Sequence, residues 1–254
     1  MKESDKMTAS GSRTVKVFSA RACAAPLEEA AKLYESETGA HIEISVCNRH
    51  CASPVAEEAT GNAAHHADFL VEIAEEGIHD LAISGAEYLL DDGEVRGIVV
   101  KGARRTIAYR ESALIVPAGN PARIANLEDL RKPGIRVAIS VIDCLKGLWE
   151  DGCGRAGLIG LIRPNIAFRA NGCVAIVEAV AQGKVDAAFG WSSFAHLAPG
   201  RIEVVRLPAE YCIRRGTGIG LLTFSKNPDE AVKFMDFLTT APAKACYKKY
   251  GWII

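Results

Sequence analysis

Short runs of apolar and β-branched residues alternate with segments of helical periodicity along most of the chain. The first run, 14–19 (TVKVFS), is typical of a strand. Segment 26–34 follows it, with a proline near its start and apolar residues at helical spacing. Gly39 is expected to end that helix, and the alternating segment 41–46 (HIEISV) predicts a second strand. The order strand, helix, strand indicates a parallel α/β sheet.

The same alternation continues and divides the chain into two α/β lobes. Further strands are predicted at 80–84, 107–117, 136–140, 185–189, 202–207 and 219–224, and further helices at 69–77, from 87, after a cap at Asn126, and at 145–157, 174–182, 229–238 and 242–250. We assign 1–13 to a flexible leader, 14–106 with 209–254 to the first lobe, and 107–208 to the second. Two chain crossings make a hinge, and a hinge between lobes forms a ligand cleft.

Composition and charge narrow the functional classes. Of 254 residues, 49% are hydrophobic and 24% are charged, which suffices for a buried core. The net charge is -1, with 30 basic and 31 acidic residues, so we expect no nucleic-acid partner. No apolar run reaches the roughly 20 residues that cross a bilayer, and 1–13 lacks the apolar centre of a signal peptide. The chain fits an exported protein expressed without its signal, and equally a cytosolic one.

Motifs of common enzyme classes are missing from the sequence. It contains no G-x-S-x-G, no Walker loop and no H-E-x-x-H. The glycine-rich run 216–220 (GTGIG) precedes a predicted strand, whereas a dinucleotide-binding loop follows a strand and opens a helix. We therefore expect a binding protein and not an enzyme.

Eight cysteines are the most distinctive chemical feature. Their even number permits four disulfides, but disulfide frameworks are typical of short secreted chains. Thiolates are also the ligands that soft metals and iron–sulfur clusters prefer. Cys47 and Cys51 form C-x3-C, a spacing that suits a shared metal, a local disulfide or two unrelated buried thiols. Spacing alone leaves these uses open.

Several segments, in order, resemble the molybdate-type substrate-binding proteins of ABC transporters. The resemblance is carried by 17–20 (VFSA), 26–31 (PLEEAA), 37–39 (ETG), 80–84 (DLAIS) and 248–252 (KKYGW), and it extends from about 15 to 254. It implies a two-lobed α/β protein of the type 2 periplasmic binding fold. It also implies a small inorganic solute, a membrane ABC permease as partner, and a periplasmic or extracytoplasmic location. We separately expect a monomer, although the sequence leaves the oligomeric state open.

The loops that hold the oxyanion in that family differ here. The family uses small hydroxyl residues and backbone N–H groups at helix N-termini. The corresponding loops are 19–23 (SARAC), 47–51 (CNRHC), 143–144 (DC) and 171–173 (NGC), and the family's aromatic position falls near Trp191. Each of the four loops carries a cysteine, so molybdate or tungstate is not the expected ligand. Segment 52–68, which holds His65 and His66, is longer than the resemblance predicts and could cover the cleft.

We predict that the cleft binds an iron–sulfur cluster or a soft metal. Four thiolates match the requirement of a 4Fe–4S cluster or a tetrahedral metal site. The predicted ligands are Cys47, Cys51, Cys144 and Cys173, with Cys23, His50, His65 and His66 as possible further ligands. Ser19, Arg21, Arg49, Asn171 and Trp191 are predicted to line the cleft, where arginine could hold an anion or neutralise a cluster.

Two alternatives stay open at this point. The protein could bind an oxyanion such as molybdate or tungstate, with cysteines that are only structural. It could instead be a cytosolic metal or redox sensor, or an electron-transfer protein, built on the same fold. Cys246 is expected in the core because free cysteine is commonly buried, and Cys153 and Cys212 have no assigned role.

Overall fold

The computed structural model describes residues 14–47 and 69–254, and within them nine strands form one mixed sheet. Its order is β2-β1-β3-β9-β4-β7-β5-β6, with β8 pairing to β4 beside this path. The strands are β1 (Thr14–Ser19), β2 (His41–Val46), β3 (Leu81–Ser84), β4 (Val99–Pro117), β5 (Val137–Ser140), β6 (Ile166–Ala170), β7 (Ala187–Trp191), β8 (Ile202–Arg206) and β9 (Arg214–Leu222). Strands β1 and β2 have the predicted bounds.

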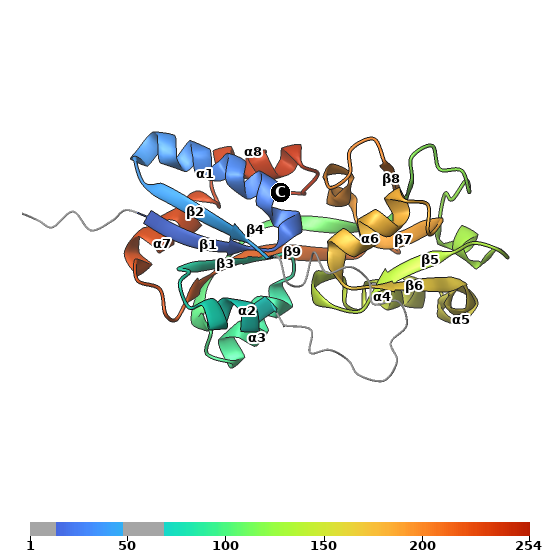
Figure 1. The fold of residues 1–254 in the computed structure, drawn as a ribbon, viewed down its shortest axis with the longest axis horizontal. Helices are drawn as coiled ribbons and strands as arrows, with labels where there is room; N and C mark the ends of the chain where they lie inside the picture. Colours follow the sequence, from blue (N-terminus) through green and yellow to red (C-terminus); the bar gives the residue numbers. More distant parts are fainter. Residues whose placement is uncertain (1–13, 48–68) are drawn as a thin grey trace, which may run out of the picture.

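Strand β4 passes from one half of the molecule into the other and creates the two-lobed shape (Figure 1). Its residues 99–111 pair with β9, which in turn pairs with β3. Its residues 112–117 pair with β7 and β8. The first lobe therefore contains the parallel strands β1, β2 and β3, and the second contains β5, β6 and β7. The residues at which one lobe ends and the other begins stay a prediction.

Helices cover both faces of each half. They are α1 (Ala24–Thr38), α2 (Phe69–Glu76), α3 (Glu87–Val95), α4 (Leu148–Arg155), α5 (Ile159–Ile162), α6 (Gly172–Ala181), α7 (Pro228–Phe237) and α8 (Ala241–Lys249), with 3-10 turns η1 (Arg21–Cys23), η2 (Leu127–Arg131), η3 (Asp143–Leu145), η4 (Arg163–Asn165) and η5 (Ser192–His196). Figure 1 shows α1 and α8 on one face of the first lobe and α2 and α3 on the other. None of the helices in the described ranges is long and apolar enough to cross a membrane.

Two helix signals in the sequence are confirmed by their local geometry. Gly39 follows α1 in the left-handed conformation, with φ of 69°, and its N–H donates to the carbonyl of Glu35. Asn126 precedes η2, and its side chain accepts from the N–H of Asp129 while the Asp129 carboxylate accepts from the N–H of Asn126. The second element is a 3-10 turn and not the predicted α-helix.

The glycine-rich run before the predicted strand is itself part of β9. Because side chains alternate along a strand, Gly216, Gly218 and Gly220 share one face. A Cβ atom on Gly218 would lie within 3.0 Å of Glu87 and Leu90 in α3. The glycines therefore let α3 approach the sheet, which explains a run that strand propensity alone disfavours.

One apolar cluster continues from the first lobe into the second. It includes Phe18 and Phe69 on one side and Trp191 and Phe194 on the other, all at most 3% exposed. Two further clusters lie within the lobes, one under α1, α7 and α8 and one beside β5 and α4. The continuous cluster places buried side chains of both lobes around the junction where the ligand cleft was predicted.

Candidate functional site

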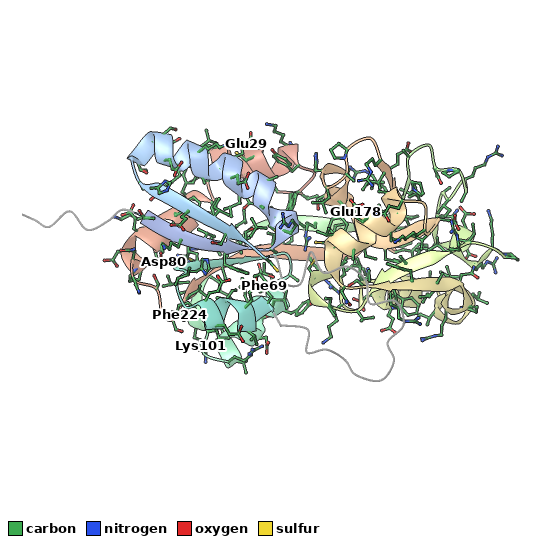
Figure 2. The ribbon with its side chains drawn as sticks, in the orientation of Figure 1. Glu29, Phe69, Asp80, Lys101, Glu178 and Phe224 are labelled. Carbon is green, nitrogen blue, oxygen red and sulfur yellow. The ribbon has the colours of Figure 1, made fainter. Side chains whose placement is uncertain are left out.

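A cavity lies between the lobes, beyond the carboxyl ends of β1, β3 and β5. The space between the atoms in this region is about 430 Å³, a figure that includes open solvent. Its walls are formed by Ala20, Ala22, Cys23, Phe69, Ser84, Gly85, Leu89, Arg110, Ile142, Cys144, Leu145, Gly172 and Cys173. Parallel strands bring the loops at their carboxyl ends to one edge of the sheet, where α/β proteins bind ligands. Phe69, at the start of α2, lies at the inner end of the first lobe (Figure 2).

Arg110 is the charged side chain among these lining residues. It lies on β4, where the strand crosses between the lobes, and it is fully buried. Its Nη2 donates to the carbonyl of Gly85, and its guanidinium carbon lies 4.6 Å from the centre of the Trp191 ring. Its Nε and Nη1 are buried and have no hydrogen-bond partner within the described part of the chain. The N–H groups on Nε and Nη1 are therefore left for a ligand.

The cavity is electropositive. Burial lowers the pKa of Arg110, but the neighbouring thiols, Cys144 foremost, act in the opposite direction, and its pKa stays above the usual arginine value. Burial raises the pKa of the Cys23 thiol to about 12, although Arg110 opposes this shift. Cys23 is thus protonated at neutral pH and supplies no negative charge. None of the described lining residues is acidic, so the charge of Arg110 is left for a bound solute to neutralise.

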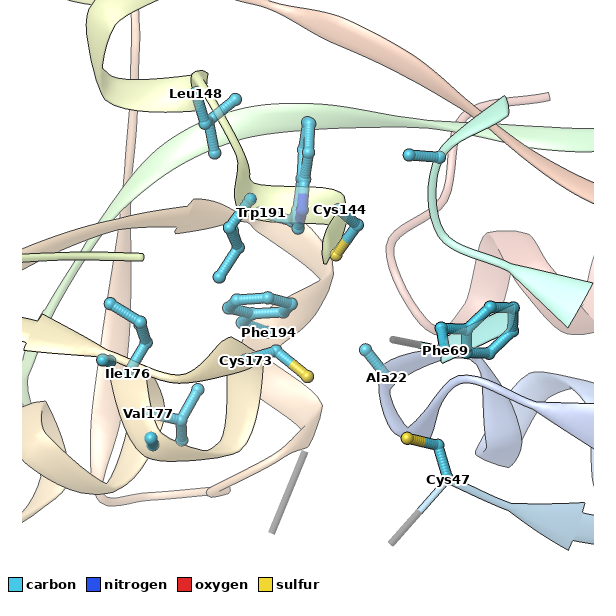
Figure 3. Packing of buried hydrophobic residues seen from close by; sticks show 14 of the residues in the cluster. Ala22, Cys47, Phe69, Cys144, Leu148, Cys173, Ile176, Val177, Trp191 and Phe194 are labelled. Atoms are coloured by element: carbon cyan, nitrogen blue, oxygen red, sulfur yellow. The ribbon is translucent and has the colours of Figure 1, made fainter. Parts of the chain in front are cut away.

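Three of the predicted cysteines meet at this cavity. Cys23 ends η1, Cys144 lies in η3, and Cys173 lies in the first turn of α6. Figure 3 shows Cys144 and Cys173 on one side of the junction and Ala22 and Phe69 on the other. Loops of both lobes therefore bring these three cysteines to one space.

Cys47 is placed differently from the other three. It is buried beside β2 but is not a lining residue, and its Sγ lies 3.6 Å from Oε2 of the buried Glu72. Cys51, Arg49, His50, His65 and His66 lie outside the described residues. Within 14–47 and 69–254, no three His, Cys, Asp or Glu side chains are placed to hold a metal ion. The four-cysteine ligand set stays a prediction.

The remaining cysteines carry no disulfide in the described ranges. Cys153, Cys212 and Cys246 are free thiols, as are Cys23, Cys144 and Cys173. Cys246 is buried on α8, where its Sγ lies 3.6 Å from the carbonyl of Pro242, in agreement with the predicted core position.

None of the other predicted lining residues that the structure describes is in the wall of the cavity. Ser19 is fully buried, and its hydroxyl donates to the carbonyl of Ala20, so it supports the cavity wall from behind. Arg21 is half-buried in η1, and Asn171 is half-buried at the start of α6. Trp191 is buried behind the guanidinium of Arg110 and does not itself line the cavity. Their roles in ligand binding stay predictions.

Arg110 is the residue that sequence reasoning missed. It lies in the run 107–117 (IAYRESALIVP), which was interpreted only as a crossing strand. The sequence does contain an indication of this role: Arg110 is a charged residue within a predicted strand whose other residues are mostly apolar and so are expected to be buried. Arginine is seldom fully buried without a partner, so such a position indicates a functional role.

The fold and the cavity together define a two-lobed binding protein, and comparison with known proteins identifies its family. Residues 15–253 match the family model described as bacterial extracellular solute-binding protein, and the chain belongs to that family. Membership implies a small solute and a membrane transport partner, and it confirms the prediction of a solute-binding protein and not an enzyme. No curated protein sequence matches the chain.

Solved structures confirm the two-lobed periplasmic binding fold. PEB3 from Campylobacter jejuni with bound L-phospholactate is 19% identical, with a TM-score of 0.76 over 94% of this chain and 99% of that one. The periplasmic molybdate-binding protein of Azotobacter vinelandii is 20% identical, with a TM-score of 0.72 over 94% and 99%. The sulfate-binding protein SubI of Mycobacterium tuberculosis is 15% identical, with a TM-score of 0.76 over 94% and 86%. Identities this low show a shared fold and leave the ligand open.

Proposed function

We propose that this protein captures a small anion between its lobes and presents it to an ABC permease on the outer side of the membrane. The observation that carries the proposal is Arg110, a fully buried cation with unpartnered N–H donors at the cavity. A buried charge without a counter-ion is unfavourable, and a bound anion that accepts from those donors removes the penalty. Three proteins that share this fold are PEB3 with bound L-phospholactate, a molybdate-binding protein and a sulfate-binding protein; these ligands are all anions, and this supports the same ligand class here.

Helix α6 adds to the attraction for an anion. Its first residues, Gly172 and Cys173, line the cavity, and the ten-residue helix directs the positive end of its dipole there. Arg110 and the start of α6 come from different elements of the chain. A solute that contacts both would hold the walls of the cavity together, which is how closure of two lobes is coupled to capture.

The three thiols at the cavity favour a second, finer candidate. Cys23, Cys144 and Cys173 present sulfur, which prefers soft ligands. The solute could therefore be thiol-ligated, as the sequence predicted: an iron–sulfur cluster or a soft metal complex, with Cys47 and Cys51 as the other proposed ligands. Such thiolate complexes are negatively charged, so Arg110 would complement them as well.

The anion proposal is tested by isothermal titration of the protein with L-phospholactate, molybdate and sulfate. At least one is expected to bind, and Arg110→Gln is expected to weaken that binding by about thirtyfold or more, because truncating one partner of a buried charge pair costs about 2 kcal/mol or more. Arg214→Gln is the matched control, because Arg214 is 66% exposed and pairs with Glu111. Equal affinity in Arg110→Gln and the control would contradict the proposal.

The thiol-ligated candidate is tested on protein purified without oxygen. Iron, sulfide and multi-metal analysis with a visible spectrum should reveal bound cluster or metal, and Cys47→Ser together with Cys144→Ser should remove it. Protein that is colourless and metal-free, and that still binds an anion through Arg110, would contradict this candidate while leaving the anion proposal intact.

A further inference from the structure

We propose that Arg215 is a positioning residue of the cavity, which holds the turn carrying Cys144 in place and so limits the access of solvent to the cavity. Its Nη1 donates to the carbonyls of Cys144 and Lys146, at 3.1 and 2.9 Å. Its Nη2 donates to the carboxylate of Asp151 at 3.0 Å. These three hydrogen bonds from one planar guanidinium group hold both ends of the segment 144–151. Lysine cannot replace them, because its ammonium group lacks the planar arrangement of donors.

The hydrogen bonds of Arg215 connect the two lobes, because of its position on β9. Arg215 lies near the start of β9, which continues into pairing with β3 of the first lobe. Segment 144–151, to which Arg215 donates, follows β5 of the second lobe. The guanidinium carbon also lies 5.7 Å from the rings of Tyr88, on α3, and Trp191, on β7. One side chain therefore contacts elements on both sides of the cavity.

The surroundings of Arg215 make these contacts effective. Its side chain is only 16% exposed, whereas the side chain of Asp151 is 52% exposed. The ion pair alone is therefore partly screened by water, and the two carbonyl bonds carry more of the restraint. Cys144 and Leu145 line the cavity next to the carbonyl groups that Arg215 binds. Loss of the guanidinium therefore allows this part of the cavity wall to move.

The experiment measures access to the cavity and needs no knowledge of the solute. Iodoacetamide is added to the folded protein, and the alkylation rate of each cysteine is followed by peptide mass spectrometry. Cys173 is the main reporter, because it lines the cavity and no hydrogen bond from Arg215 reaches it. Cys246 is the internal reference, since it is buried on α8 and does not line the cavity.

Arg215→Gln is expected to raise the alkylation rates of Cys144 and Cys173 by about tenfold or more, because hydrogen bonds to a charged group of this kind shift a local opening equilibrium by at least that factor. Asp151→Asn should raise these rates less, since it leaves both carbonyl bonds in place. Arg215→Lys should give rates between those of the parent protein and Arg215→Gln. Arg214→Gln should have no effect.

Two results would overturn the proposal. One is equal cavity alkylation in Arg215→Gln and Arg214→Gln. The other is a parallel rise at Cys246, because this would show general destabilisation and no local opening. Both results are independent of anion binding, so this test can fail while the proposed function stands, and the reverse.

Discussion

Arg110 on β4 and Arg215 on β9 lie directly opposite each other where the two strands pair. Like charges at such positions repel, but the ring of Trp191 attracts both guanidinium groups, whose carbon atoms lie 4.6 and 5.7 Å from its centre. Arg215 also has the carboxylate of Asp151 as a counter-ion, whereas Arg110 has none in the described part of the chain. The uncompensated charge of the pair therefore lies at the cavity.

The first prediction concerns the stability of the ligand-free protein. Arg110→Met removes a buried, uncompensated charge and keeps an apolar chain in its place. We expect the free energy of unfolding without ligand to rise by about 1 kcal/mol or more, while anion binding is lost. Urea unfolding followed by circular dichroism, with and without anion, measures both effects. A lower stability of Arg110→Met would mean that the bond to Gly85 and the contact with Trp191 outweigh the burial of charge.

Much of the fold could be predicted because its signals are local. The β-branched run of β1 and the alternation of β2 specify strands without tertiary information, and Gly39 specifies a helix end. Strand β6 (IAFRA) was missed because only five residues, with two of them exposed, carry its pattern. The first part of β4 was missed because it is polar and is held by pairing with β9, a partner more than one hundred residues away.

The site was predicted in part for a similar reason. Cys23, Cys144 and Cys173 line the cavity, and the sequence placed them on ligand loops through the family resemblance, because loops after the strands of one sheet meet at its edge. Arg110 was missed because it lies within a strand and not on a loop. It is at the cavity only because β4 crosses between the lobes at this residue. Cys47 also follows a strand, yet it turns toward Glu72, and spacing along the chain contains no information on that rotation.

The second prediction concerns the close packing around Gly190 in β7. A Cβ atom there would lie 2.8 Å from Cγ1 of Ile115 and 2.9 Å from Cδ2 of Phe194, and both neighbours are fully buried. Gly190→Ala is therefore expected to lower the free energy of unfolding by about 1 to 3 kcal/mol. Gly160→Ala is the matched control, since that glycine lies in α5 with no atom within 4 Å of the added methyl. Equal stabilities of the two variants in urea unfolding would refute the packing argument.

The third prediction concerns Asp80, which is labelled in Figure 2 and bonds to two other segments of the first lobe. Its Oδ2 accepts from the N–H of Lys16, and its Oδ1 accepts from the hydroxyl of Ser225 and from the N–H groups of Lys226 and Asn227. Asparagine would turn an N–H donor toward one of these donors. We expect Asp80→Asn to lower the free energy of unfolding by about 2 to 3 kcal/mol, because Asp80 is buried and its bonds are to a charged acceptor.

Asp92→Asn is the control for Asp80, measured by the same urea unfolding. The carboxylate of Asp92 is 50% exposed and pairs with Arg96 on the surface of α3. Such pairs contribute little, so we expect a change within about 0.5 kcal/mol. If Asp80→Asn lowered the free energy of unfolding no more than Asp92→Asn does, the hydrogen bonds of Asp80 would be unimportant for stability.

The last prediction concerns pH. His79 is 1% exposed and packs against Phe18 at 5.1 Å between ring centres, and neither ring nitrogen has a hydrogen-bond partner in the described ranges. Burial lowers the pKa of His79, although the carboxylate of Glu76, 3.6 Å from Nδ1, partly opposes the shift. The unfolded chain therefore binds the proton more readily than the folded protein. The stability from this residue is present above the unfolded pKa of about 6.5 and falls with pH toward the folded value.

His79→Leu should remove this contribution to the pH dependence. We expect the free energy of unfolding of the variant, relative to the parent protein, to increase as pH falls below about 6.5, since leucine takes no proton. Urea unfolding at several pH values from neutral to acid measures the difference. His41→Gln is the control, because His41 is 68% exposed and its ring is accessible to water. A constant difference between His79→Leu and the parent across this range would mean that His79 titrates alike in the folded and unfolded states.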